Sequence, residues 1–254
     1  MRAEPDEPMS TSDTRSGAPR ILPCGDTALT VEFGRVIDAA LNAQVLALDR
    51  AVARAAIEGI VEAVPTYRSL LVHYDPLTVG FDALAQRLGA LLDEPAPPPP
   101  KLRRWRIPVV YGGEYGLDLQ YVANLHGLST DEVIRIHCGG DYRVAMIGFT
   151  PGWSYLSGLD PRIATPRQQN PRTHTPAGTI SIGGVQAGVQ CLAGPSGWHL
   201  LGRTPVRTYQ VRRDPVFLLD PGDAITFYPI EAALFDELDR AAQQGKPVAE
   251  LVLS

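Results

Sequence analysis

The segment from Pro95 to Pro100 reads PAPPPP, and it limits the possible folds of this chain more than any other feature. A run of prolines favours extended polyproline geometry and fits neither a helix interior nor the middle of a sheet. We therefore predict a linker over residues 95–101 between a domain at 20–94 and a second domain at 102–254. The alternative is an internal loop of one larger domain, and the change of composition after the prolines favours the border.

Residues 20–94 carry the pattern of a small α/β domain. Leu29 to Phe33 alternate as in a half-buried strand, and the segment that follows has apolar residues at helical spacing. Two further strands are expected around Pro65, followed by an amphipathic helix with Leu84 and Leu88 on one side. The order β-α-β-β-α predicts a sheet with helices on one face.

Residues 102–254 begin as a strand, two short helices and a strand, and Ser129 and Glu132 have the spacing of a capping box at the second helix. After Gly148, short β-prone runs alternate with Gly and Pro, a pattern typical of a β-barrel or a compact β-sandwich. We choose the barrel. A last helix is expected to place Leu234 and Leu238 on its apolar side. The predicted fold class is α+β.

Composition excludes several classes of protein. The net charge of −5 argues against a nucleic-acid partner, because phosphate binding needs a basic face. No apolar run approaches the roughly 20 residues of a membrane span. Residues 1–19 lack the apolar core of a secretory signal and are expected to be a disordered tail. Three cysteines at distant spacings suit a reducing cytoplasm.

Familiar catalytic motifs are missing. The five histidines and three cysteines show no metal-ligand spacing, so we expect no metal site intrinsic to the chain. No phosphate-binding Walker A loop occurs. Ser154 and Ser196 do not lie in the G-x-S-x-G sequence of a nucleophile elbow.

The stretch GFTPGWSYL, residues 148–156, holds three aromatic residues among prolines and glycines. Pro151 and Gly152 interrupt any strand where the aromatics arrive, so a shaped loop is expected. One interpretation makes Phe149, Trp153 and Tyr155 the wall of a cleft. The other makes them packing at the end of the barrel or a contact with a partner subunit.

Arginines recur between Asp160 and Thr204, at Arg162, Arg167, Arg172 and Arg203. Guanidinium groups on rigid loops suit bidentate recognition of carboxylate or phosphate, which predicts an anion site. The alternative pairs each arginine with a surface acid. Gln186 and His199 could bind an amide-like ligand or could be buried structural groups.

Several long motifs carry a family resemblance. The stretches GFTPGWSYLSGLDPR, TPRQQNPRTHTPAGTISIGGVQAGV and GPSGWHLLGRTP, with GDTALTVEFG and VPTYRSLLVHYD upstream, resemble the family that contains the B subunit of bacterial ATP-dependent 5-oxoprolinase. The family also includes the kinase inhibitor KipI, the proteins labelled allophanate hydrolase subunit 1, and carboxyltransferase domain subdomains C and D. Trp153 replaces a usual Phe, and Gln190 and Cys191 replace a frequent Tyr-Pro.

The resemblance implies a ferredoxin-like N-terminal domain and a cyclophilin-like β-barrel. It also implies a component of 5-oxoprolinase, inactive alone, that acts with the A and C subunits to open 5-oxoproline to glutamate with ATP hydrolysis. A lactam resists hydrolysis, and phosphorylation of its oxygen by ATP with Mg²⁺ would activate it. A KipI-like regulator that inhibits a sensor histidine kinase is the alternative.

The candidate site residues lie in the motifs that carry the resemblance. The expected catalytic residues are Arg203, Gln186 and His199. The expected substrate-binding or ATP-binding residues are Phe149, Trp153, Tyr155, Arg167, Arg172, Gly178, Ser181, Gly197 and Thr204.

Overall fold

The computed structural model describes residues 18–253, so the tail predicted at 1–19 lies almost entirely outside the described residues. The chain splits into two compact units, and the division falls between Ala96 and Pro97. This point lies inside the segment that the sequence assigns to the linker. Within residues 18–253, no helix is long and apolar enough to cross a membrane.

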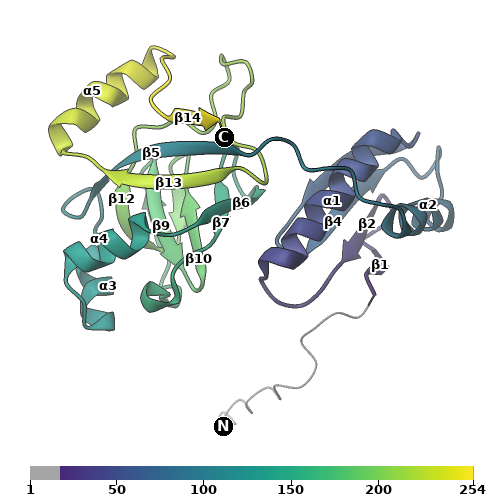
Figure 1. The fold of residues 1–254 in the computed structure, drawn as a ribbon, viewed down its shortest axis with the longest axis horizontal. Helices are drawn as coiled ribbons and strands as arrows, with labels where there is room; N and C mark the ends of the chain where they lie inside the picture. Colours follow the sequence, from purple (N-terminus) through teal and green to yellow (C-terminus); the bar gives the residue numbers. More distant parts are fainter. Residues whose placement is uncertain (1–17, 254) are drawn as a thin grey trace, which may run out of the picture. The chain divides into compact units, whose positions relative to one another are not determined.

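The first unit is an antiparallel sheet of four strands with two helices, in the strand order β1-β2-β4-β3 (Figure 1). Its apolar core contains residues of both helices and of the sheet. The elements are β1 (Arg20–Pro23), β2 (Ala28–Glu32), α1 (Ala39–Ala55), β3 (Ile60–Pro65), β4 (Ser69–Tyr74) and α2 (Phe81–Asp93).

Helix α1 shows how the sequence determines these elements. Asp38 caps its first turn, because the carboxylate accepts hydrogen bonds from the backbone N–H groups of residues 40 and 41 at 2.8 and 3.0 Å. Val45, Leu48 and Val52 are buried on one face, at the spacing that places side chains on the same side of a helix. The helix ends at Ala56, whose backbone is left-handed.

The second unit is a closed barrel with three helices. Its elements are β5 (Arg103–Tyr111), α3 (Leu119–His126), α4 (Thr130–Cys138), β6 (Tyr142–Ile147), β7 (Ser154–Ser157), the 3₁₀ turn η1 (Pro161–Ile163), β8 (Arg172–Thr175), β9 (Thr179–Gly183), β10 (Gln186–Val189), β11 (Gly194–Ser196), β12 (His199–Arg203), β13 (Ala224–Pro229), α5 (Ala232–Gln243) and β14 (Glu250–Leu253).

Strand β5 closes the barrel. The sheet runs β12-β9-β10-β7-β6-β13-β5, and β5 pairs again with β12, where Val110 faces Arg203 and Tyr111 faces Gly202. Figure 1 shows β5 in teal beside the yellow-green β13, with which it pairs in parallel. This ring of seven strands confirms the predicted α+β fold with a barrel, whereas the ferredoxin-like assignment of the first unit stays a prediction.

Helices α3 and α4 contribute Leu119, Val122, Val133 and Ile136 to the barrel's apolar core. The predicted capping box at α4 is confirmed, because Ser129 and Glu132 satisfy each other's backbone N–H groups.

The predicted apolar face of α5 is partly wrong. Leu234 is 41% exposed, whereas Phe235 and Ala242 are buried. The buried Phe235 ring contacts the Tyr115 ring edge to face, with 5.1 Å between the ring centres.

A buried histidine makes the barrel sensitive to acid. His137 is fully buried beside Tyr142 and Phe227, and its Nδ1 lies 2.8 Å from the Tyr111 hydroxyl. Burial lowers the pKa of His137 from 6.5 to about 3. The titratable groups around it are Tyr111, Cys138 and Tyr142, and burial raises the pKa of each.

We expect the free energy of unfolding to fall as the pH drops from 6.5 toward 3. In this range the unfolded chain protonates His137 and the folded chain does not, so the loss attributable to this residue is about 1.4 kcal/mol per pH unit. Above pH 6.5 its contribution is complete. The free energy of unfolding can be measured with urea at pH 7, 6, 5 and 4. Plotted against pH, it should change less steeply in His137→Gln, by the equivalent of about one proton. Equal slopes in both proteins would contradict this assignment.

Candidate functional site

The loop between β6 and β7 has a fixed shape. Gly148 N–H donates to the Trp153 carbonyl at 3.1 Å, and the Thr208 hydroxyl donates to the Gly152 carbonyl at 2.7 Å. Gly152 has a φ of +76°, and a Cβ there would lie 2.5 Å from Cβ of Tyr209. The predicted shaped loop therefore needs glycine at this position.

The loop gathers aromatic rings on the outer face of the barrel. Trp153 is buried and meets Phe149 edge to face at 5.7 Å, whereas Phe149 is 68% exposed. Trp153 also meets Trp198 at 5.9 Å, and Tyr155 meets Trp198 at 5.7 Å. Trp198 is not among the predicted site residues, although it lies in the motif GPSGWHLLGRTP.

Two glycines make room for Trp198. A Cβ at Gly183 of β9 would lie 2.8 Å from the Trp198 ring, and one at Gly188 of β10 would lie 3.0 Å from it. The indole therefore lies against bare backbone on the barrel surface. Glycine in a strand often marks such a close approach.

Between these rings is a cavity of about 320 Å³, the aromatic hollow. It is lined chiefly by Phe149, Trp153, Tyr155, Trp198, Arg167 and Gln168, and Gly197 also borders it. Burial raises the pKa of Tyr155 above its usual value near 10, and the hydroxyl is a possible hydrogen-bond donor at neutral pH with or without this shift.

Arg167 is the charged residue of this hollow. Its guanidinium lies 5.3 Å from the centre of the Trp198 ring and donates to Oε1 of Gln186 at 3.3 Å. Across residues 18–253, no carboxylate forms an ion pair with it. The structure thus joins two residues that the sequence analysis selected separately, Arg167 and Gln186.

The other arginines of the predicted anion site are already bound within the protein. Arg162 pairs with Asp160 at 2.6 Å and lowers the pKa of this carboxyl to about 2. Arg203 donates to the Ala177 carbonyl at 3.2 Å, and its guanidinium lies 5.4 Å from the Phe235 ring.

Arg172 pairs with Asp118, the residue before α3, which holds the neighbouring segment in place. The Asp118 carboxylate accepts two hydrogen bonds from Arg172, at 2.6 and 2.9 Å, and one from the Leu200 N–H at 2.8 Å. The Gln168 side-chain amide donates to it at 3.3 Å. Asp118 therefore ties residues 168–172 to strand β12.

A second cavity of about 590 Å³, the amide hollow, lies on the other side of the same segment. It is lined chiefly by Asp118, Tyr121, His199, Arg167, Gln168, Gln169 and Asn170. His199 stacks on Tyr121 at 5.1 Å, and its Nε2 donates to the Pro166 carbonyl at 2.8 Å. Its buried Nδ1 has no partner among the described residues. Arg167 and Gln168 border both hollows.

Besides Arg172, Gln186 and Arg203, three more predicted residues do not line either hollow. Thr204 is buried, and its hydroxyl accepts a hydrogen bond from the Val206 N–H at 3.1 Å. A Cβ at Gly178 would lie 2.3 Å from the Thr204 carbonyl oxygen. Ser181 is fully buried, and its Oγ has no partner within residues 18–253.

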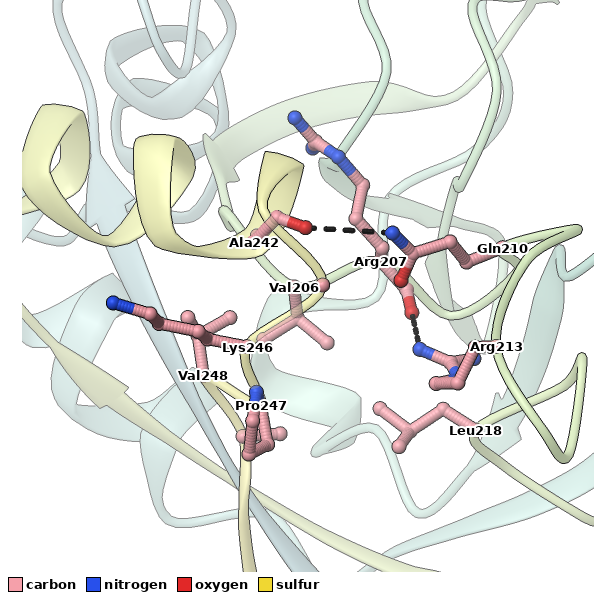
Figure 2. Close-up of a pocket in the computed structure, with 11 residues that line it drawn as sticks. Val206, Arg207, Gln210, Arg213, Leu218, Ala242, Lys246, Pro247 and Val248 are labelled. Carbon is pink, nitrogen blue, oxygen red and sulfur yellow. Dashed lines mark hydrogen bonds between the residues drawn. The ribbon is translucent and has the colours of Figure 1, made fainter.

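A smaller cavity of about 120 Å³ lies at the end of α5 (Figure 2). Arg207 pairs there with Asp239, and Arg213 donates to the Arg207 carbonyl at 2.7 Å. Since the protein itself uses both guanidinium groups, this cavity lacks a free arginine for a ligand. In the described part of the chain, no cluster of three or more His, Cys, Asp or Glu side chains could hold a metal ion.

Comparison with known proteins identifies the family. Residues 19–219 match the family described as carboxyltransferase domain, subdomain C and D. The chain belongs to this carboxyltransferase domain family. The resemblance inferred from the motifs is thereby confirmed.

Named relatives of this carboxyltransferase domain chain are subunits of an enzyme. It is 38% identical to the B subunit of 5-oxoprolinase from Bacillus subtilis over 217 residues, which cover 81% of this chain and 90% of the relative. It is 37% identical to that of Escherichia coli O157:H7, over 81% of this chain and 93% of the relative. The crystal structure of TTHA0988 matches with a TM-score of 0.72 at 36% identity, over 81% of this chain but only 40% of that longer chain.

Proposed function

We propose that this chain is the B subunit of an ATP-dependent 5-oxoprolinase that opens 5-oxo-L-proline to L-glutamate together with the A and C subunits. The observation that carries the proposal is the identity of 37–38% to proteins named as 5-oxoprolinase B subunits, along 90% or more of their length. We also propose that the chain works in the cytoplasm and is inactive alone.

The chemistry of the two hollows supports an activating role rather than a nucleophilic one. Neither hollow pairs a serine or cysteine nucleophile with a base among its lining residues. Transfer of the γ-phosphoryl group of ATP to the lactam oxygen would release ADP and leave a phosphorylated lactam. Water would then add at the ring carbon, and the C–N bond would break to give an acyl phosphate of glutamate. A second water would cleave the bond to phosphate and give glutamate and phosphate.

The protein's part in such a reaction is to position the substrate and to offset negative charge. Arg167 and Gln168 border both hollows and are suited to this task. ATP with Mg²⁺ supplies the phosphoryl group when bound in the complex. We propose no metal ligands on this chain.

Finer features of the fold belong to the same proposal. The order β1-β2-β4-β3 with two helices supports a ferredoxin-like first unit, and the closed barrel of seven strands supports a cyclophilin-like second unit.

The test is ADP release that depends on 5-oxoproline. The complete mixture of this chain with the A and C subunits is expected to release ADP, whereas the chain alone and the mixture without it are expected to release none. A stable complex of the three proteins that releases no ADP would overturn the proposal and favour another substrate or a regulatory role.

A further inference from the structure

Among the four arginines predicted for the anion site, Arg167 and Arg203 form no ion pair within residues 18–253, and only Arg167 lines one of the two hollows. Arg162 and Arg172 pair with Asp160 and Asp118, and Arg203 lies against Phe235, outside both hollows. Among the arginines predicted for the anion site, Arg167 alone lines a cavity without a carboxylate to neutralise it. Its charge is therefore available for an anion from outside the chain.

The guanidinium of Arg167 is positioned in advance. It lies over the Trp198 ring at 5.3 Å and donates to Gln186 at 3.3 Å, and these contacts limit its orientations. A group that is already oriented loses less conformational freedom when a ligand binds. Gln186 is thus a positioning residue for Arg167.

The aromatic hollow is suited to a small flat ligand. Its volume of about 320 Å³ lies at the lower end of the roughly 300–1,000 Å³ of small-molecule sites, and its walls present the rings of Trp153, Tyr155 and Trp198. Aromatic faces pack well against planar rings. An apolar ring next to a cation is the arrangement that a planar ring with one carboxylate requires.

The hollow also contains groups for an amide. Gln168, which lines the hollow, donates a side-chain N–H to Asp118 at 3.3 Å, so its Oε1 can still accept a hydrogen bond. The Tyr155 hydroxyl can donate to a lactam oxygen, since a tyrosine is protonated at neutral pH.

We propose that the aromatic hollow binds a small planar ring carboxylate, with the ring against Trp198 and the carboxylate on Arg167. The identity of the ligand as 5-oxoproline rests on the proposed function. With 5-oxoproline as the ligand, the aromatic hollow is the lactam-binding site. Arg167 then makes this site prefer a lactam with a carboxylate over a neutral lactam.

The experiment uses the complex of the three subunits and three variants: Arg167→Gln, Arg167→Lys and the control Arg162→Gln. Arg162 is a suitable control because it lies in the same stretch but pairs with Asp160, outside both hollows. For Arg167→Gln we expect the KM for 5-oxoproline to rise by about 10- to 100-fold, with the KM for ATP unchanged. Arg167→Lys should recover part of this loss, and Arg162→Gln should match the unmodified complex.

A neutral probe isolates the carboxylate contact. 2-Pyrrolidinone has the lactam ring but no carboxylate, so the unmodified complex should bind it far more weakly than 5-oxoproline, as measured by calorimetry. Arg167→Gln should bind both compounds with nearly equal affinity. If Arg167→Gln still bound 5-oxoproline as much more tightly than 2-pyrrolidinone as the unmodified complex does, the inference would be overturned.

The remaining outcomes separate this inference from the proposed function. If the complex turns over 5-oxoproline and Arg167→Gln leaves its KM unchanged, the inference fails and the function stands. If the complex releases no ADP, the function fails, and binding of pyrrole-2-carboxylate decides the inference: loss of binding in Arg167→Gln supports it, and equal affinity overturns it. If Arg167→Gln prevents assembly, the hollow is a contact between subunits and the inference fails.

Discussion

Replacement of Asp118 by Ala is expected to lower the free energy of unfolding by about 2–4 kcal/mol, because it removes one partner of a partly buried ion pair and the acceptor of a buried backbone N–H. The side chains of Asp118 and Arg172 are only 10% and 29% exposed, and Arg172 would keep its charge without a counterion. The Leu200 N–H would also lose its acceptor. Urea unfolding at pH 7 measures the change.

The matched control is Glu250→Gln. Glu250 pairs with Arg106 at 2.6 Å, the same separation as in the Asp118–Arg172 pair, but the two side chains are 55% and 45% exposed. Exposed pairs contribute about 1 kcal/mol or less. If Asp118→Ala cost no more than Glu250→Gln, Asp118 would not hold the segment at residues 168–172.

Replacement of Trp198 by Ala is expected to cost about 3–5 kcal/mol of unfolding free energy and also to weaken ligand binding. Trp198 is 5% exposed and fills the space above Gly183 and Gly188. Its loss opens a cavity that neither glycine can fill, and it removes the surface on which Arg167 lies. Urea unfolding and calorimetric titration with 5-oxoproline measure the two effects.

The variant Phe149→Ala tests whether the destabilisation expected for Trp198→Ala comes from the burial of the ring or from the loss of an aromatic residue of the cluster. Phe149 belongs to the same aromatic cluster but is 68% exposed, so its removal should change the unfolding free energy by about 0.5 kcal/mol or less. Equal destabilisation by Trp198→Ala and Phe149→Ala would contradict the packing described for Trp198.

The sequence predicted features that depend on local patterns. The capping box at Ser129 follows from two side chains three residues apart, and the shaped loop follows from Pro151 and Gly152 among aromatic residues. The short strands of the second unit follow from glycines and prolines between β-prone runs, although the same pattern also fits a β-sandwich. Each of these signals lies within a few residues of the structure that it specifies.

The contacts that build the site were not predictable in this way. Asp118 lies 54 residues before its partner Arg172, and no local pattern joins them. Arg203 shares a sequence segment with Arg167, yet it lies near Tyr115 and Phe235. The role of Trp198 depends on Gly183 and Gly188 of the β9–β10 hairpin, and the packing of the indole on that hairpin is a tertiary contact.

The closure of the barrel by β5 determines the order in which the chain can fold during synthesis. Arg104 of β5 pairs with Ala224 of β13, 120 residues later, whereas the first unit finds all its strand partners between Arg20 and Tyr74. Contacts between distant residues form slowly, and domains begin to fold as they leave the ribosome. The first unit is therefore expected to fold while the barrel is still being translated. Strand β5 cannot complete its pairing until β12 and β13 have been synthesised, so we expect its apolar residues to remain unpaired during this interval.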